Sequence, residues 1–140
     1  KHIYSAADVL LATSMGEGFG IPTIEAQACG TPVIVSQFAG SAELGGPHST
    51  LIHGQKVWDE FQGSFWIVPD TRQIHGALEM NYQATKAKAV DREKVRQFAL
   101  HYDADLIYDT HWRPLIKLLA ARTQPVAPVN RAERRAKKGK

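Results

Sequence analysis

Two short apolar runs, at residues 9–12 and 32–35, flank a glycine-rich loop and a helical segment. The second run is rich in β-branched residues, which is typical of a strand that is buried on both faces. Between the runs, Pro22 stands where a helix tolerates a residue without an N–H group, and Gly30 stands where a helix can end in a left-handed conformation. This spacing predicts a helix over residues 21–29. Strand, helix and strand joined by short loops indicate an α/β fold with a Rossmann-like parallel sheet.

The segments around this unit have a weaker pattern. Residues 1–7 are interpreted as the end of a helix, and residues 41–44 as a helical turn. A weak strand is expected over residues 49–52. Residues 53–63 are polar and are expected to be irregular, whereas the run at 65–68 is predicted to be a third strand.

Helical spacing dominates the second half of the chain. Asp70 or Thr71 can cap a helix, and further helices are predicted over residues 90–100 and 105–121, the last kinked or broken by Pro114. The apolar positions that set these helical faces are Ile74, Leu78 and Tyr82, then Val95, Phe98 and Ala99, then Ile107, Leu115 and Leu118. The last group is interpreted as a stripe that packs helices together. We expect a partial Rossmann-like domain with C-terminal helices over residues 1–122, followed by a linker and a basic tail over residues 123–140.

The charge is distributed unevenly along the chain. The 140 residues include 17 Lys and Arg and 14 Asp and Glu, but residues 131–140 alone hold six basic side chains and one acidic one. The rest of the chain is slightly acidic, so the basic run is interpreted as a solvated tail, with weak contact to an anionic surface as the alternative. No aromatic residue is interleaved with these charges, so specific nucleic-acid binding is not expected.

Cysteine content and hydropathy exclude two classes of protein. Cys29 is the single cysteine, which excludes a disulfide framework and fits a reducing compartment. No apolar run approaches the roughly 18 residues that a membrane-spanning helix needs. We therefore expect a cytoplasmic protein, with membrane association as an alternative.

The candidate chemistry lies in the loop before the helix at 21–29. Glycines let the backbone approach a ligand, and the N–H groups of a helix N-terminus attract phosphate or sugar hydroxyls. Glu17 in the loop and Glu25 in the helix add carboxylates that can accept hydrogen bonds from vicinal hydroxyls. The combination suits a ligand that is part phosphate and part sugar. The alternative is that the loop is only a tight connection and both acids are solvated.

Other chemistries have weaker support. The six histidines show no metal-ligand spacing, and no Asp-x-Asp pair occurs near the loop, so no metal or cofactor is expected. Gly16, Gly18 and Gly20 between a strand and a helix suggest a dinucleotide-binding module as an alternative. The spacing of that fingerprint is incomplete, because Ile24 does not supply a further glycine. In addition, no acidic residue ends the next strand.

Several motifs in this order resemble the C-terminal domain of family-4, or group 1, glycosyltransferases of the GT-B fold. They are the lead-in Tyr4-Ser5-Ala6-Ala7-Asp8, the loop Glu17-Gly18-Phe19-Gly20, the Glu17 to Glu25 spacing, Gly30-Thr31-Pro32-Val33-Ile34, and Gly40-Ser41-Ala42-Glu43. The resemblance is close over about the first 45 residues and holds only in outline beyond them.

The resemblance implies a role for each matched residue. Glu25 would bind the ribose of a nucleotide-diphosphate sugar, and Glu17 would hydrogen-bond hydroxyls of the transferred sugar as the candidate catalytic residue. The backbone of the four residues Gly18, Phe19, Gly20 and Ile21 would contact the sugar and the diphosphate. The implied reaction is glycosyl transfer with retention and without a required metal.

Length separates the chain from a complete enzyme of this family. Such an enzyme has two Rossmann-like domains, whereas this chain corresponds to part of one and does not begin with Met. We expect a donor-binding fragment that is inactive without an N-terminal acceptor domain or a partner chain. The alternative is a non-catalytic interaction subunit.

Overall fold

The structure is a computed structural model in which residues 2–123 are described. The chain divides into two compact units, residues 1–103 and 104–140. The first unit contains the strands and most of the helices, and the second unit is helical where it is described.

A three-stranded parallel sheet forms the centre of the first unit. Its strands are β1 (Leu10–Ala12), β2 (Val33–Ser36) and β3 (Thr50–Ile52), in the order β1-β2-β3. All residues of the central strand β2 are buried, as its β-branched run predicts. The predicted α/β class with a parallel sheet and C-terminal helices is confirmed.

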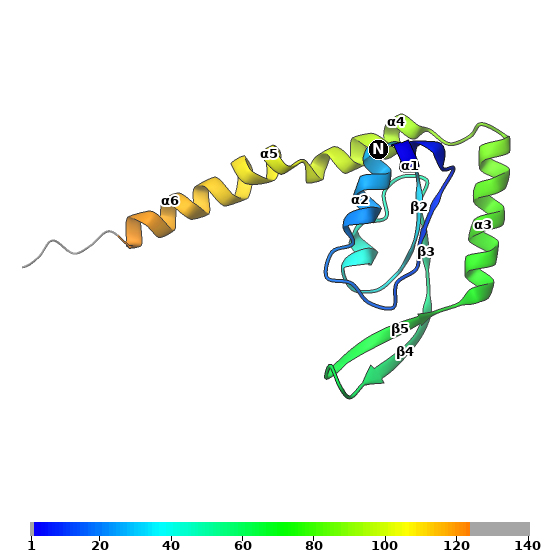
Figure 1. Ribbon diagram of the computed structural model, residues 1–140, viewed down its shortest axis with the longest axis horizontal. Helices are drawn as coiled ribbons and strands as arrows, with labels where there is room; N and C mark the ends of the chain where they lie inside the picture. Colours follow the sequence, from blue (N-terminus) through cyan, green and yellow to red (C-terminus); the bar gives the residue numbers. More distant parts are fainter. Residues whose placement is uncertain (1, 124–140) are drawn as a thin grey trace, which may run out of the picture. The chain divides into compact units, whose positions relative to one another are not determined.

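Helices cover both faces of this sheet (Figure 1). Helix α2 (Ile21–Ala28) packs through Ala26 against Val33 and Val35 of β2, and Tyr4 of α1 (His2–Ala6) joins the same cluster. On the opposite face, Ile34 packs with Ile52 and with Ala77 of α3 (Thr71–Lys86). The alternation of side chains along β2 therefore creates two cores, one for each helical layer.

A glycine lies at each end of α2, and the one at the C-terminal end, Gly30, was predicted. Its N-cap Gly20 has φ of 95°, and Gly30, just after the helix, has φ of 79°. Both values lie in the left-handed region, which glycine adopts without a steric cost. A Cβ atom on Gly30 would also lie 3.0 Å from the backbone oxygen of Arg92, the first residue of α4 (Arg92–Ala99). The apolar face predicted for α4 is confirmed, because Val95 and Ala99 are buried and Phe98 is half-buried.

A β-hairpin replaces the irregular segment expected over residues 53–63. Strands β4 (Gly54–Asp59) and β5 (Ser64–Pro69) pair antiparallel in a sheet of their own. The strand predicted over residues 65–68 is confirmed as part of β5, and its partner β4 was not predicted. The third parallel strand is β3. The turn forms because Asp59 Oδ1 accepts the N–H groups of Phe61 (2.8 Å) and Gln62 (3.1 Å).

Helix α3 keeps only part of the predicted face toward the sheet: Ile74 packs against the core there, whereas Tyr82 is exposed. Asp70 caps it, accepting the N–H groups of Arg72 and Gln73. Ala77 and Asn81 are its buried residues, whereas Leu78 is 39% exposed. Small Ala77 allows close approach to the sheet. Asn81 tolerates burial because its amide donates to the Ala77 carbonyl at 2.8 Å.

Two one-turn helices complete the first unit: η1 (Ala39–Glu43), at the turn predicted over 41–44, and η2 (Leu100–Tyr102). The second unit contains α5 (Ala104–Ile107), a π-helical turn η3 (Tyr108–Trp112) and α6 (Arg113–Arg122). The π-turn lies just before Pro114, where the missing N–H and the proline ring disturb α-helical bonding as predicted.

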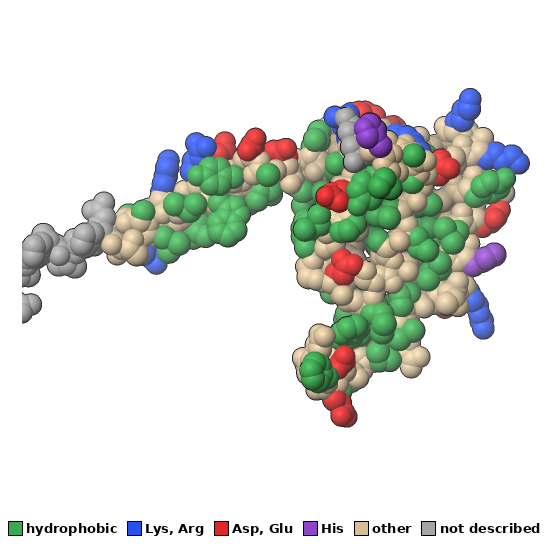
Figure 2. All heavy atoms as spheres, in the orientation of Figure 1, with side chains coloured by type: hydrophobic (Ala, Val, Ile, Leu, Met, Phe, Trp, Pro, Cys, Tyr) green, Lys and Arg blue, Asp and Glu red, His purple; other side chains and the backbone are tan. Residues whose placement is uncertain are grey.

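The apolar side chains of the second unit are not buried. Figure 2 shows hydrophobic groups gathered along one side of these helices. The exposed members are Leu106, Tyr108, Trp112, Leu115, Ile116, Leu118 and Leu119. The interpretation that Ile107, Leu115 and Leu118 pack helices together stays a prediction; within the second unit Ile107 is half-buried, and Leu115 and Leu118 are exposed. The basic run at 131–140 lies outside the described residues.

Candidate functional site

The two glycine motifs of the sequence meet at one edge of the sheet. The loop over residues 13–20 follows β1 and the segment with η1 follows β2, and the carboxyl ends of parallel strands share an edge. The Gly40 N–H donates to the Glu17 carbonyl at 3.2 Å. A Cβ atom on Gly40 would overlap the Gly18 carbonyl. Glycine at position 40 thus lets η1 close against the loop.

Glu17 is folded back over its own loop. It is half-buried, and Ser14 Oγ donates a hydrogen bond to Glu17 Oε1. Glu17 Oε2 lies 2.9 Å from the position that a Cβ atom would take on Gly20, the N-cap of α2. The carboxylate therefore lies close to the start of α2, where the helix dipole favours negative charge.

Glu25 is exposed on α2, and the phenol of Tyr4 binds it. Tyr4 Oη donates to Glu25 Oε2 at 2.9 Å. This hydrogen bond is the main cause that raises the pKa of the Tyr4 phenol, and desolvation and the charge of Glu25 add to it. The contact leaves Glu25 with further acceptor positions for a ligand.

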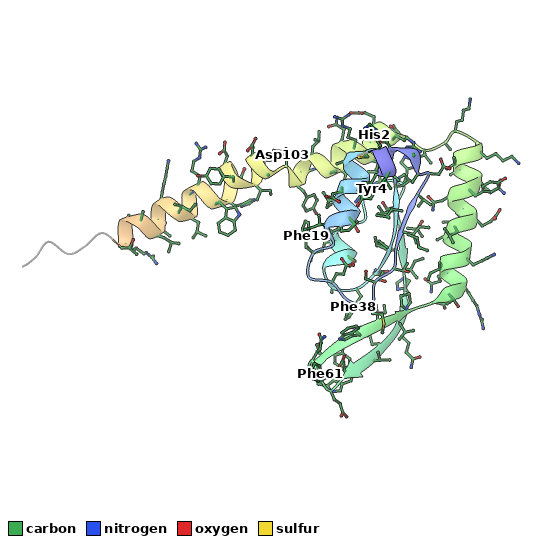
Figure 3. All side chains as sticks on the ribbon, in the orientation of Figure 1. His2, Tyr4, Phe19, Phe38, Phe61 and Asp103 are labelled. Carbon is green, nitrogen blue, oxygen red and sulfur yellow. The ribbon has the colours of Figure 1, made fainter. Side chains whose placement is uncertain are left out.

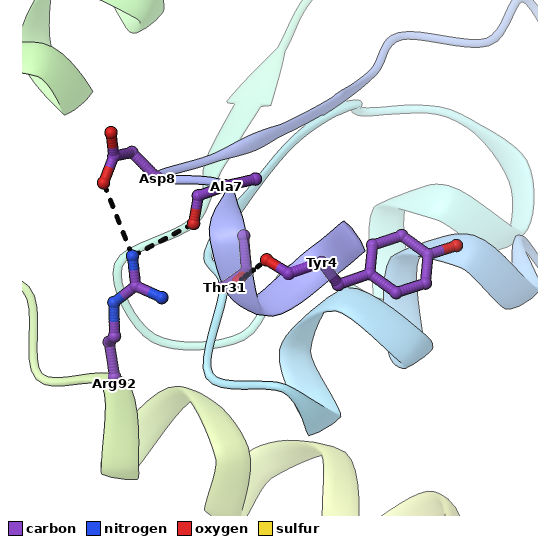
Figure 4. Close-up of polar contacts among 5 residues, drawn as sticks. All are labelled: Tyr4, Ala7, Asp8, Thr31 and Arg92. Atoms are coloured by element: carbon purple, nitrogen blue, oxygen red, sulfur yellow. Dashed lines mark hydrogen bonds and ion pairs between the residues drawn. The ribbon is translucent and has the colours of Figure 1, made fainter. Parts of the chain in front are cut away.

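The rest of the protein anchors the helix that carries Tyr4 (Figure 4). Thr31 Oγ1 donates to the Tyr4 carbonyl at 2.8 Å, and Arg92 donates to the Ala7 carbonyl at 3.0 Å. Arg92 also pairs with Asp8 at 3.5 Å. The lead-in motif thus fixes α1 against both α2 and α4, which positions the Tyr4 hydroxyl for Glu25.

Gln27 is a positioning residue that the sequence reasoning missed. Its side chain is fully buried; Nε2 donates to the carbonyls of Thr23 (3.1 Å) and Leu44 (2.7 Å), and Oε1 accepts the Gly46 N–H (3.0 Å). These bonds join α2 to the segment after η1. The helical spacing of Thr23, Ala26, Gln27 and Gly30 was the available signal.

A pocket of 360 Å³ opens between the glycine loop and the hairpin. Glu17 and Gly18 line it together with residues of η1 and β5, and the hairpin is held to the loop because the Ile67 N–H donates to the Met15 carbonyl at 2.9 Å. The complete lining is Gly16, Glu17, Gly18, Phe38, Ala39, Gln62, Ser64, Phe65 and Trp66. The pairing of β4 with β5 as a hairpin was not predicted from the sequence.

The other predicted site residues lie outside this lining. Phe19 is 45% exposed and meets the ring of Tyr102 edge-on, with the centroids 5.8 Å apart. Ile21 is 63% exposed, and Gly20 is buried at the helix start. The structure therefore brings Glu17 and Gly18 to the hairpin pocket and Glu25 to Tyr4.

Metal-binding clusters and membrane-spanning helices were sought in the described part of the chain. Among residues 2–123, no group of three or more His, Cys, Asp or Glu side chains is placed to hold a metal ion. Within the same residues, every helix is too short or too polar to cross a bilayer.

The part of the chain that contains the glycine loop is similar to a known protein family. Residues 1–63 match the family model of glycosyl transferases group 1. The group 1 match covers the lead-in motif, the glycine loop, α2 and η1.

Two relatives extend the group 1 similarity over more of the chain. The D-inositol 3-phosphate glycosyltransferase of Saccharomonospora viridis is 49% identical over 114 residues, which are 79% of this chain and 24% of that protein. The enzyme of the same name from Mycolicibacterium smegmatis is 38% identical over 128 residues, 90% of this chain and 27% of that protein. The chain thus spans about a quarter of the length of these two relatives.

Proposed function

We propose that this chain supplies the donor-binding part of a retaining, family-4 glycosyltransferase of the GT-B fold. The observation that carries the proposal is the joining of the two matched motifs through Gly40, which places the glycine loop and the start of α2 at the carboxyl edge of a parallel sheet. Ligands of open α/β sheets bind at that edge. The donor would be a nucleotide-diphosphate sugar, and no cofactor is proposed.

The two carboxylates take separate roles in this proposal. Glu25, oriented by Tyr4, would accept hydrogen bonds from the ribose hydroxyls. Glu17, held by Ser14, would accept hydrogen bonds from hydroxyls of the transferred sugar and is the proposed catalytic residue. The backbone of Gly18, Phe19, Gly20 and Ile21 would contact the sugar and the diphosphate. No side chain caps α2, so the diphosphate can take that place at the helix N-terminus.

The acceptor half of the reaction would come from an N-terminal domain or a partner chain. The exposed apolar side chains of α6, such as Leu115 and Ile116, are suited to contact such a partner. The names of the relatives make D-inositol 3-phosphate the first acceptor to test. Cytoplasmic location and weak contact of residues 131–140 with an anionic surface remain parts of the proposal.

A titration with nucleotide sugars tests the donor site. Uridine, guanosine and adenosine diphosphate sugars are added to the ¹⁵N-labelled chain, and amide shifts are followed. We expect one donor to perturb residues 18–25. Glu25→Ala should lower the affinity for the corresponding nucleoside diphosphate about tenfold. Glu17→Ala should lower the affinity for the nucleotide sugar only.

Glu79→Ala, a change of an exposed carboxylate on α3, is the matched control and should leave both affinities unchanged. The donor site is refuted if all three nucleotide classes leave residues 18–25 unperturbed. That outcome would favour the second candidate, a non-catalytic interaction subunit, which the exposed apolar side of α6 supports.

A further inference from the structure

The hairpin presents an aromatic surface that the rest of the described chain does not cover. Trp58 is 54% exposed, Phe61 97% and Phe65 56%. Phe61 lies at the tip of the hairpin, while Phe38 lies where η1 begins, above the hairpin (Figure 3). Leaving large aromatic groups in water costs free energy, so an uncovered group of them indicates a binding surface.

Part of this aromatic surface forms a wall of the 360 Å³ pocket beside the glycine loop. Phe65 and Trp66 line it with the amide of Gln62, and Glu17 lies on the loop side. Trp58, opposite Phe65 in the hairpin register, supports the Phe65 ring edge-on with the centroids 5.0 Å apart. The aromatic wall is therefore backed by a second ring.

The chemistry of the lining selects among ligand classes. Glu17 is the only charged side chain among the described lining residues, and Lys56 Nζ lies 5.9 Å from the centroid of the Phe38 ring. The two opposite charges leave little net charge around the pocket, which suits a neutral ligand. Gln62 and Glu17 offer polar groups for hydroxyls, while Phe38 and Phe65 offer apolar faces. Ser64 and Trp66, the neighbours of Phe65 in β5, lie in the lining, but their side chains point to the other face of the hairpin. A pyranose ring has both an apolar C–H face and an edge of hydroxyls, and it matches this division.

We propose that the hairpin, through Gln62 and Phe65, forms a binding wall for a neutral pyranose ring held beside Glu17. The inference rests on the proposed function, in which Glu17 binds a sugar. It adds a second binding element for that sugar, which comes from a different part of the chain. Two sources share this chemistry, the transferred sugar of the donor and a sugar of the acceptor.

An amide-shift titration of the ¹⁵N-labelled 140-residue chain tests the wall. The probes are D-glucose, D-mannose, N-acetyl-D-glucosamine and uridine diphosphate, each alone. At least one free sugar should shift the amides of residues 62–66, and uridine diphosphate should not. Phe65→Ala should lower the affinity for that sugar about fivefold, and Gln62→Ala should lower it measurably. Phe61→Ala, on the same hairpin but outside the lining, should bind as the unchanged chain does.

A competition experiment separates the two sources. If the nucleotide sugar that binds residues 18–25 displaces the free sugar from the hairpin, the wall holds the transferred sugar; if both bind together, it holds an acceptor sugar. Either result supports the wall. Sugar shifts that spare residues 62–66, no binding of any of the three sugars, or equal binding by a folded Phe65→Ala variant would overturn it. The donor site would stand in those cases, because nucleotide shifts at residues 18–25 test it separately.

Discussion

The hydroxyl of Tyr4 donates a hydrogen bond of 2.9 Å to the carboxylate of Glu25, across 21 residues of sequence. The two side chains come from α1 and α2, and Tyr4 also packs against the buried cluster of Ala26, Val33 and Val35. This contact fixes the orientation of the one helical carboxylate that we assign to the donor ribose.

Replacing Tyr4 by Phe tests this orientation. The ring can keep its packing, so the free energy of unfolding should change by less than about 1 kcal/mol. Nucleotide-sugar affinity should fall about threefold to fivefold, because Glu25 loses its fixed rotamer. Calorimetric titration measures the effect, and Tyr82→Phe, an exposed tyrosine on α3, is the matched control. Unchanged affinity in Tyr4→Phe would show that Glu25 needs no support from Tyr4.

The close approach of Gly40 to Gly18 predicts a steric effect. Gly40→Ala should destabilise the protein by about 1–3 kcal/mol, because the new methyl group would overlap the Gly18 carbonyl. The same change should weaken donor binding by displacing the loop. Gly16→Ala is the control, since a Cβ atom there meets nothing within 4 Å and should change stability by about 0.5 kcal/mol or less. Urea denaturation followed by circular dichroism compares the two, and equal midpoints would contradict the contact.

The buried amide of Gln27 predicts a larger loss of stability. Gln27→Leu keeps the approximate volume but leaves the Leu44 carbonyl and the Gly46 N–H without their partner. The free energy of unfolding should fall by about 2–4 kcal/mol. Gln83→Leu, which removes an exposed i, i+4 bond to Glu79, should cost about 0.5 kcal/mol or less. A similar loss in the two variants would show that the buried network contributes little.

The N-cap of α4 predicts a dependence of stability on pH. Asp91 accepts the Lys94 N–H at 3.0 Å, and this bond is the main cause that lowers the pKa of the Asp91 carboxyl, with the charges of Lys94 and His48 adding to it. A lowered pKa means that the charged form stabilises the fold above the ordinary value of 3.8, and that this contribution is lost as the pH falls through the lower folded-state value.

Asp91→Asn should therefore be less stable than the unchanged chain at pH 7, with the gap closing as the pH falls toward 2. Asp91→Ala is the comparison, because it also removes the capping oxygen and should remain less stable in acid. Thermal unfolding between pH 7 and pH 2 measures both variants. A gap for Asp91→Asn that stays constant over this range would contradict the assignment.

Local patterns in the sequence were sufficient for the βαβ unit and its loop. The buried run at β2, the proline at the start of α2 and Gly30 at its end act within a few residues of chain, so periodicity and backbone preference determine them. The resemblance to group 1 glycosyltransferases came from the same region, and the family model matches it over residues 1–63.

The hairpin and the α3 face depended on contacts between distant segments. Nothing in the polar run at β4 signals a strand, and its partner β5 carries an apolar run that could equally have joined the parallel sheet. The hairpin is placed by Asp59 in its turn and by the bond from Ile67 to Met15. The face of α3 was set by the small size of Ala77 against Ile34 and Ile52.

The sequence by itself determined the α/β class, the parallel order of strand and helix around the glycine loop, and the two carboxylates. Only the tertiary structure decided that Tyr4 binds Glu25, that Gln27 ties α2 to the segment after η1, and that the hairpin closes a pocket beside Glu17. The reason is physical. Hydrophobic periodicity and backbone preferences are local, whereas a hydrogen bond between residues far apart in the chain exists only after packing has brought its two groups together.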